Sequence, residues 1–378
     1  MKSTTLIRLS TLLALAIPLC AAAQQKPAKL QYKHESINIS AATKDEPIAA
    51  KLSIEKASAY LEEGAKAWVG QRNCISCHTT GAYLRYRPAL TPHLGKPSAD
   101  MRDFFVREME KLKKMDRENF QKGVRTAQAV YVAAGLAEWD AHVTGKLSPE
   151  TDQALQLVFE VQQDNGAWQS TDCWPPYESS AYQEASVAIM AAATAPGWLK
   201  SKSGVALKAQ IDKANAYLRD TPAPHDYAKV LKLWAATRVP GIAAQAERKE
   251  LIEKIWSLQQ DDGGWSMRSF AEPEQWGSGN RAGKLRAEPE FKNPPSDGHM
   301  TGLATLVLRD ASVAAKDPRI QKAVTWLKSN QRESGRWWTR SLNNDKFHFI
   351  TYSGTAYPLL ALMKCGELPN APRRVAVR

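Results

Sequence analysis

The turn that decides the fold occurs three times, and its first copy reads Gln163-Asp164-Asn165-Gly166-Ala167-Trp168. The second copy reads Gln260-Asp261-Asp262-Gly263-Gly264-Trp265, and the third reads Gln331-Arg332-Glu333-Ser334-Gly335-Arg336-Trp337. Each copy follows one helical pattern and precedes a second helix that is rich in small and apolar residues. The glycine ends the first helix in a left-handed turn, and the tryptophan covers the helix ends. The repetition therefore predicts turns between paired helices.

Apolar periodicity and helix-breaking residues predict six such pairs along the chain. The predicted pairs are 48–70 with 79–90, 99–115 with 124–142, 149–163 with 178–195, 204–219 with 226–238, 244–260 with 298–311, and 318–330 with 351–365. Six hairpins close an all-α, (α/α)6 toroid, in which one helix of each pair lies outside and one lines the interior. We expect one toroid domain over residues 47–370, with a loop insertion at 266–295.

With these turns and pairs, the chain resembles the α/α-toroid repeat family of squalene and terpene cyclases and protein prenyltransferases, whose repeats carry a Q-x-x-x-G-x-W turn. The resemblance implies a cavity that binds a hydrophobic substrate, such as a terpenoid. The cyclases use an acidic D-x-D-D cluster, and the prenyltransferases use a zinc site of Asp, Cys and His. Neither pattern stands at the matching position here, where the sequence reads Asp297-Gly298-His299-Met300. Classical cyclase or prenyltransferase chemistry is therefore not expected.

The second signal is Cys74-Ile75-Ser76-Cys77-His78, which has the C-x-x-C-H pattern of covalent c-type haem attachment. In this pattern Cys74 and Cys77 bind the porphyrin, and His78 is the proximal ligand of the iron. A zinc site would need further ligands, and the other cysteines of the mature chain are singletons. A thioredoxin-like pair would need a βαβ context, whereas the flanks are helical. Alignment with residues 331–338 places the motif in the turn of the first hairpin, so we predict one covalent haem c there.

The sixth iron ligand is left open by the sequence. His299 is the first candidate, because it starts an interior helix at the mouth that holds the haem. The other candidates at this mouth are His225, Met300, His348 and Cys173. Five-coordinate iron is a further alternative. In a competing architecture, residues 47–120 form a separate small cytochrome c domain, with Met101, Met109 or Met115 as the ligand.

The N-terminal sequence predicts export. Residues 1–23 have a positive start, a short apolar stretch and a small-residue cleavage site, which together are typical of a secretory signal peptide. Residues 24–46 are expected to form a flexible leader, and the protein is expected to be periplasmic or otherwise exported. No later segment is apolar for long enough to predict a transmembrane span in the mature chain. The formal net charge of +12 suits an acidic redox partner, an anionic lipid surface or a polyanionic substrate, although scattered solvating lysines explain it better. No basic run with interleaved aromatics indicates nucleic-acid binding.

Together these features predict an exported, metal-binding haem protein that acts as an oxidoreductase or in electron transfer. Its partners would be a redox protein, a hydrophobic small molecule, or both. One alternative is a non-catalytic electron carrier or haem-based sensor that uses the toroid as a scaffold. Another is an α/α-barrel enzyme that acts on polysaccharide. The sequence leaves open whether the protein is an enzyme, and it identifies no catalytic residue.

Overall fold

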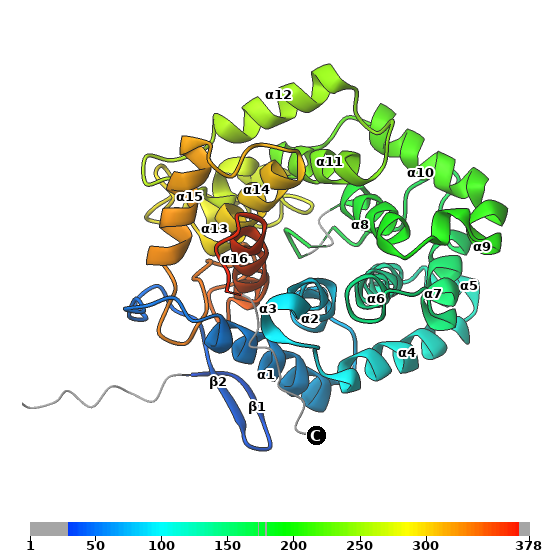
Figure 1. Ribbon diagram of the computed structural model, residues 1–378, viewed down its shortest axis with the longest axis horizontal. Helices are drawn as coiled ribbons and strands as arrows, with labels where there is room; N and C mark the ends of the chain where they lie inside the picture. Colours follow the sequence, from blue (N-terminus) through cyan, green and yellow to red (C-terminus); the bar gives the residue numbers. More distant parts are fainter. Residues whose placement is uncertain (1–28, 173, 178–179, 370–378) are drawn as a thin grey trace, which may run out of the picture.

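The predicted all-α toroid is confirmed by the computed structural model, which describes residues 29–172, 174–177 and 180–369. The predicted signal peptide lies outside this part of the chain. Six helices form an outer ring and six line the interior (Figure 1). The outer helices are α1 (Ile54–Arg72), α4 (Ala99–Lys113), α7 (Pro149–Glu160), α10 (Lys208–Asp220), α12 (Gln245–Trp256) and α15 (Pro318–Ser329). The inner helices are α2 (Thr80–Tyr86), α6 (Arg125–Trp139), α8 (Ala181–Thr194), α11 (Asp226–Arg238), α14 (Gly298–Asp310) and α16 (Ser353–Lys364).

The residue pattern of each helix explains whether it lies in the outer or the inner ring of the toroid. In the outer helix α10, the buried residues are Ile211, Ala214 and Leu218, which are spaced for one apolar stripe. In the inner helix α6, every residue from Thr126 to Trp139 is buried. A helix that is buried on all sides must be surrounded by other elements. The inner ring is therefore the core of the protein.

The tryptophan of each turn ties the turn to the outer helix that precedes it. In each of the three copies, the indole Nε1–H donates to the backbone carbonyl of the residue ten positions earlier. These bonds join Trp168 to Val158 (2.7 Å), Trp265 to Ile255 (2.8 Å) and Trp337 to Leu327 (2.7 Å). All three tryptophans are fully buried, so the hydrogen bond satisfies an indole that water cannot reach.

A glutamine in each turn ties the hairpin to the next outer helix. Its side-chain Nε2 donates to the carbonyl of the turn glycine, four residues on, and to a carbonyl at the start of the following outer helix. The glutamines are Gln162, Gln259 and Gln331, and the second carbonyls belong to Gln210, Arg319 and Ser53. The equivalent glutamines thus precede the predicted Gln163 and Gln260 by one residue.

The last turn closes the ring onto the first helix. Gln331 Oε1 accepts the Ser53 backbone N–H at 2.7 Å, and Ser53 is the N-cap of α1. Gly335 has a φ of 90°, and a Cβ built on it would lie 2.4 Å from the backbone carbonyl carbon of Lys56. Glycine is required here because of both the left-handed backbone and the close approach of α1. The sixth hairpin thus packs against the first, as a closed toroid requires.

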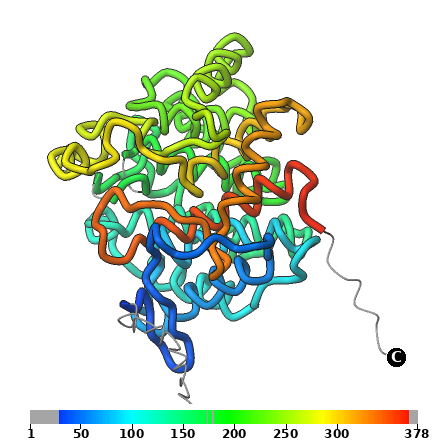
Figure 2. The backbone as a smooth tube through the Cα atoms, turned by 90° about the vertical axis from the view of Figure 1, so that its left-hand side faces the viewer, coloured from blue at the N-terminus to red at the C-terminus, as the bar shows by residue number. Residues whose placement is uncertain are grey.

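The remaining helical elements are short and lie in the connections between the helices of the two rings. They are α3 (Thr91–Leu94), α5 (Arg117–Phe120), α9 (Lys202–Ala206) and α13 (Ala282–Arg286), the 3-10 helices Pro88–Leu90, Trp198–Lys200, Met267–Phe270, Pro273–Gln275 and Phe349–Thr351, and a π-helix at Asp140–Thr144. Within the predicted insertion, α13 and two of these 3-10 helices lie on a long excursion (yellow in Figure 2). In the part of the chain that the structure describes, no helix is both long and apolar enough to cross a membrane.

Part of the segment expected as a flexible leader is folded. Strand β1 (Leu30–His34) pairs antiparallel with β2 (Ile37–Ser40), and this hairpin projects from the ring (Figure 2). Tyr32 and Ile39 are buried, at 3% and 6% exposed. These two apolar side chains anchor the hairpin on the toroid. The competing cytochrome domain is not seen, because α4 is an outer helix of the ring and buries Met101 and Met109 in its core.

Candidate haem-attachment site

The C-x-x-C-H stretch forms the turn between α1 and α2. Helix α1 ends at Asn73, which has a left-handed backbone with a φ of 47°. Ser76 Oγ accepts the backbone N–H groups of Thr79 and Thr80, each at 3.2 Å. Gln128 of α6 donates to the Ile75 carbonyl at 2.9 Å. The backbone between the two cysteines is therefore fixed from inside and outside the turn.

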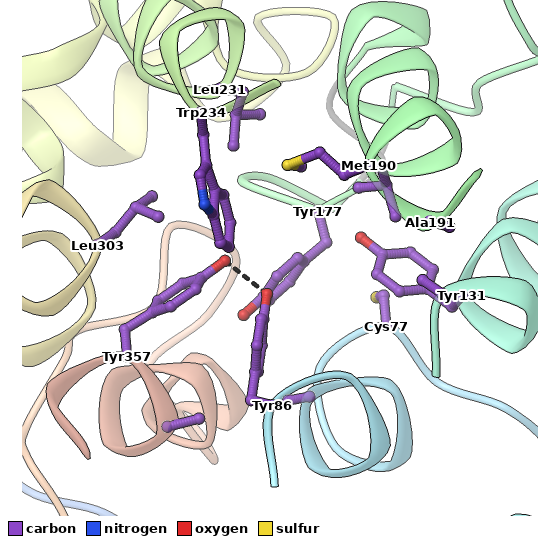
Figure 3. Packing of buried hydrophobic residues seen from close by; sticks show 14 of the residues in the cluster. Cys77, Tyr86, Tyr131, Tyr177, Met190, Ala191, Leu231, Trp234, Leu303 and Tyr357 are labelled. Carbon is purple, nitrogen blue, oxygen red and sulfur yellow. Dashed lines mark hydrogen bonds between the residues drawn. The ribbon is translucent and has the colours of Figure 1, made fainter. Parts of the chain in front are cut away.

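The two cysteines reach the same cavity from different depths. Cys77 is 6% exposed, and its side chain points towards the toroid axis near Tyr131 (Figure 3). Cys74 is partly exposed, and burial raises the pKa of its thiol. Neither cysteine forms a disulfide, and both line one cavity with His78. The three predicted attachment residues are thus brought together.

The His78 imidazole is held between aromatic rings. Its ring lies parallel to that of Phe349, with centroids 4.8 Å apart, and meets the Trp68 indole edge-on at 4.8 Å. His78 Nδ1 lies 2.6 Å from Thr79 Oγ1, which in turn lies 2.9 Å from the Tyr32 hydroxyl. Burial lowers the pKa of His78 to about 3, so the ring is neutral at pH 7. A neutral imidazole with Nδ1 engaged presents Nε2 for a metal.

The cavity beside the motif has both apolar and polar lining residues. Its volume is about 370 Å³, within the range of about 300–1,000 Å³ that is usual for cofactor and ligand sites. The apolar lining includes Trp68, Ile75, Val124, Pro175 and Phe349. The polar lining includes Gln128, Tyr177, Ser341, Asn343, Asn344 and His348. The residues present therefore fit a covalently attached haem c.

His348 is the second imidazole of this cavity. Its Nδ1 accepts the Ser341 backbone N–H at 3.0 Å. Burial lowers the pKa of His348 to about 4, so the ring is neutral at pH 7. Because Nδ1 is an acceptor, the proton of the neutral ring is on Nε2, and this nitrogen is a donor. In this arrangement His348 offers a hydrogen bond rather than a metal-binding lone pair.

His299, the first candidate for the sixth ligand, does not line this cavity. Its Nε2 lies 3.1 Å from the Tyr227 hydroxyl, and its Nδ1 lies 2.7 Å from Ser353 Oγ. Burial lowers its pKa to about 3, so it is a neutral ring with both nitrogens engaged in the core. His225 and Met300 do not line the cavity either: His225 caps α11 through its Nδ1, and Met300 is fully buried. Cys173 lies outside the described residues.

The prediction of a metal-binding, electron-transfer protein is wrong in the form in which the sequence suggested it. That prediction brings His78 and His299 to one metal, and the structure separates them. Across residues 29–369, apart from the gaps at 173 and 178–179, no group of three or more His, Cys, Asp or Glu side chains lies together in a way that would hold a metal ion. The described side chains do not build a metal-ion centre by themselves.

A second, larger cavity of about 600 Å³ adjoins the first and shares His348 with it. Asp297 lies on its wall, and burial raises the pKa of this carboxyl to about 6. Glu288, also on the wall, is paired with Arg268 at 2.8 Å and with Arg340 at 3.4 Å. Trp338 adds an aromatic surface. The lining of this cavity thus combines charged side chains with apolar surface.

The aromatic walls of the attachment site were not found from the sequence. Trp68 precedes the motif on α1, and Phe349 is far from it in the chain. Only the closure of the ring between the sixth and first hairpins brings Phe349 to His78. A search for aromatic residues flanking C-x-x-C-H identifies Trp68 and misses Phe349.

Comparison with known proteins assigns no family to this chain. No protein-family model matches the sequence, and no curated protein does. Among solved structures, a variant of a glycosidase is similar with a TM-score of 0.48 and 10% identity, over 77% of this chain and 86% of that one. A chain described as a wild-type glycosidase has a TM-score of 0.44 and 10% identity, over 83% of this chain and 86% of that one. Such distant similarity assigns no activity to this protein.

Proposed function

We propose that the protein is an exported c-type haem protein that binds a small ligand at its haem. Cys74 and Cys77 would hold haem c through thioether bonds, and His78 would hold the iron. The observation that carries this proposal is the cavity of about 370 Å³ that all three residues line. Bound haem supplies an iron centre with a coordination position for a small ligand.

The surrounding residues have defined tasks in this proposal. Phe349 and Trp68 fix the plane of the His78 ring through their aromatic contacts. Thr79 engages His78 Nδ1 and leaves Nε2 as the iron-binding atom. His348 offers an Nε2–H donor in the same cavity, which would stabilise a polar ligand. This set favours the haem-based sensor among the predicted alternatives.

The test is expression of the full chain in a host that matures c-type cytochromes. We expect a haem-stained band on a denaturing gel, and loss of the stain in Cys74→Ala and Cys77→Ala. Cys365→Ala is the matched control, because Cys365 lies at the end of α16 and outside the cavity. An unstained wild-type band from a host that matures another cytochrome c would overturn the proposal.

The optical spectrum tests ligand binding separately. A reduced protein whose Soret band shifts on addition of carbon monoxide supports an open coordination position. A stained protein whose spectrum carbon monoxide leaves unchanged contradicts the sensor proposal while retaining haem attachment. Export is tested by sequencing the mature N-terminus, which we expect at Gln24.

We propose hydrolysis of polysaccharide as a second candidate function, carried by the 600 Å³ cavity. With a pKa of about 6, Asp297 is partly protonated near neutral pH and has the property of a general acid. Glu288 supplies a second carboxyl, and two carboxyls in distinct environments are the usual requirement of glycoside hydrolysis. Release of reducing ends from oligosaccharides, abolished in Glu288→Gln, would support it. No release from a broad panel of oligosaccharides would exclude it.

A further inference from the structure

At the end of the toroid axis opposite the C-x-x-C-H turn lies a buried guanidinium that forms no ion pair. Arg85 lies in the last turn of α2 and is 6% exposed. Within the described chain it makes no hydrogen bond and no ion pair. Its charge lies instead near three aromatic rings, those of Tyr86 (5.2 Å), Trp234 (5.6 Å) and Tyr131 (5.9 Å). These three aromatic side chains come from inner helices and point towards the axis of the toroid (Figure 3).

Arg85 lines a small pocket at this end of the axis. The pocket has a volume of about 110 Å³ and is formed by the last turns of all six inner helices. A single water needs on the order of 10–15 Å³, so there is room for several waters or for a ligand of a few non-hydrogen atoms. The guanidinium offers its five N–H donors at the wall of this space, which makes the pocket a candidate binding site.

The side chains that line the pocket include one more cation than carboxylates. Glu138 is paired with Arg238 at 3.2 Å, and Asp310 is paired with Lys364 at 2.7 Å. Both carboxylates are therefore already matched with a cation each. The other titratable residues of the lining are His142, which lies 3.2 Å from Glu138, and Tyr86, whose hydroxyl lies 2.6 Å from that of Tyr357. Among the described residues of the wall, Arg85 is the cation with no carboxylate within ion-pair distance. Glu138 acts on it only through longer-range attraction.

We propose that this pocket binds one small planar monoanion, with a carboxylate group as its natural form. The guanidinium presents paired donors in a plane, which match the two oxygens of a carboxylate. A single negative charge would balance Arg85. The aromatic rings hold the guanidinium in place and exclude water from the pair, which strengthens the interaction.

Two features of the wall act without a ligand, and the experiment has to separate them from anion binding. Cation–π contacts stabilise a guanidinium directly. The carboxyl ends of the inner helices carry partial negative charge, which also favours a cation. If these two effects suffice, no anion is bound.

The test is thermal unfolding of the mature chain in increasing sodium acetate, compared with sodium chloride at equal ionic strength. A ligand that binds only the folded state raises the melting temperature with the logarithm of its concentration. We expect acetate and formate to raise it more than chloride does, and the excess should keep growing with the logarithm of their concentration. The excess should be absent in Arg85→Met and reduced in Arg85→Lys.

Arg107→Met is the matched control. Arg107 also lies over an aromatic ring, that of Phe104 at 5.9 Å, but it is exposed and lines no part of the pocket. It should keep the acetate effect. If Arg85→Met does not fold, Arg85→Lys carries the comparison, because acetate also stabilises folded proteins more than chloride without a site; an acetate excess undiminished in Arg85→Lys would then overturn the proposal. Equal effects of acetate and chloride, or an excess that survives in a folded Arg85→Met, would overturn the proposal.

Discussion

Phe349 covers one face of His78, with the two rings 4.8 Å apart and inclined by 10°. The two residues come from the sixth and the first hairpin, which meet only because the toroid closes. The ring that would hold the iron is thus positioned by the last repeat as well as by its own turn. This contact joins the stability of the fold to the geometry of the proposed site.

Replacement of Phe349 by leucine should loosen this arrangement. Leucine keeps most of the apolar volume and loses the stacked ring, a contribution of about 0.5–1.5 kcal/mol. We expect the free energy of unfolding in urea to fall by that amount. Phe291→Leu is the control, because Phe291 lies in the insertion and has a cation–π contact with Arg286 instead of a stacked imidazole. Equal losses in the two variants would contradict a special role for Phe349.

The hydroxyl of Thr79 should contribute more to the free energy of unfolding than its methyl group does. It lies between His78 Nδ1 and the Tyr32 hydroxyl; Thr79 and Tyr32 are buried, and His78 is partly buried. Thr79→Val removes the shared partner of two polar groups, and we expect a loss of about 1–3 kcal/mol in the free energy of unfolding. Thr79→Ser retains the hydroxyl and should lose less. A larger loss for serine than for valine in urea titrations would refute this.

Gly335 and Gly241 allow a matched test of ring closure. Both have left-handed backbones, with φ values of 90° and 88°. A Cβ at Gly241 would meet nothing within 4 Å, whereas one at Gly335 would collide with the backbone of α1. Gly241→Ala should cost about 1–2 kcal/mol, the strain of the left-handed conformation alone. Gly335→Ala should exceed this by about 1–3 kcal/mol, because the seam between the sixth and first hairpins must open. Calorimetric melting of the two variants compares them directly.

The protein should lose stability in mild acid, in part through His225. Burial lowers the pKa of His225 to about 4 in the folded chain, whereas an unfolded histidine has a pKa of about 6.5. The unfolded state therefore binds more protons between these values, and stability falls as the pH drops from 6.5 to 4. His225→Asn retains a helix-capping side chain and cannot titrate. Between pH 7 and pH 4 it should lose about 3 kcal/mol less than the wild-type chain does. Parallel stability curves for the two proteins would show that His225 does not carry this effect.

The fold was largely predictable, because its signals are local. Each of the three turns carries its own glycine and tryptophan within a few residues, and each helix pair shows its apolar pattern within one segment. In two turns the glutamine that makes these bonds lies one residue before the one that the sequence pattern predicts. The reason is that its second partner, such as Arg319 for Gln259, belongs to the next outer helix and is invisible in the local pattern.

The attachment residues were also local, since Cys74, Cys77 and His78 lie within five residues of one another. The sixth iron ligand, for which His299 was the first candidate, cannot be identified from neighbouring residues in the chain. A histidine at the start of an inner helix can point into the core or into the cavity, and its neighbours Tyr227 and Ser353 draw it into the core.

The sequence by itself determined the repeated hairpin, its number and the C-x-x-C-H turn, because each depends on contacts between residues close in the chain. Only the tertiary structure decided which aromatic rings enclose His78, which histidine shares its cavity, and which cation remains unpaired at the far end of the axis. These outcomes depend on side chains from several hairpins, whose relative positions are fixed when the ring closes.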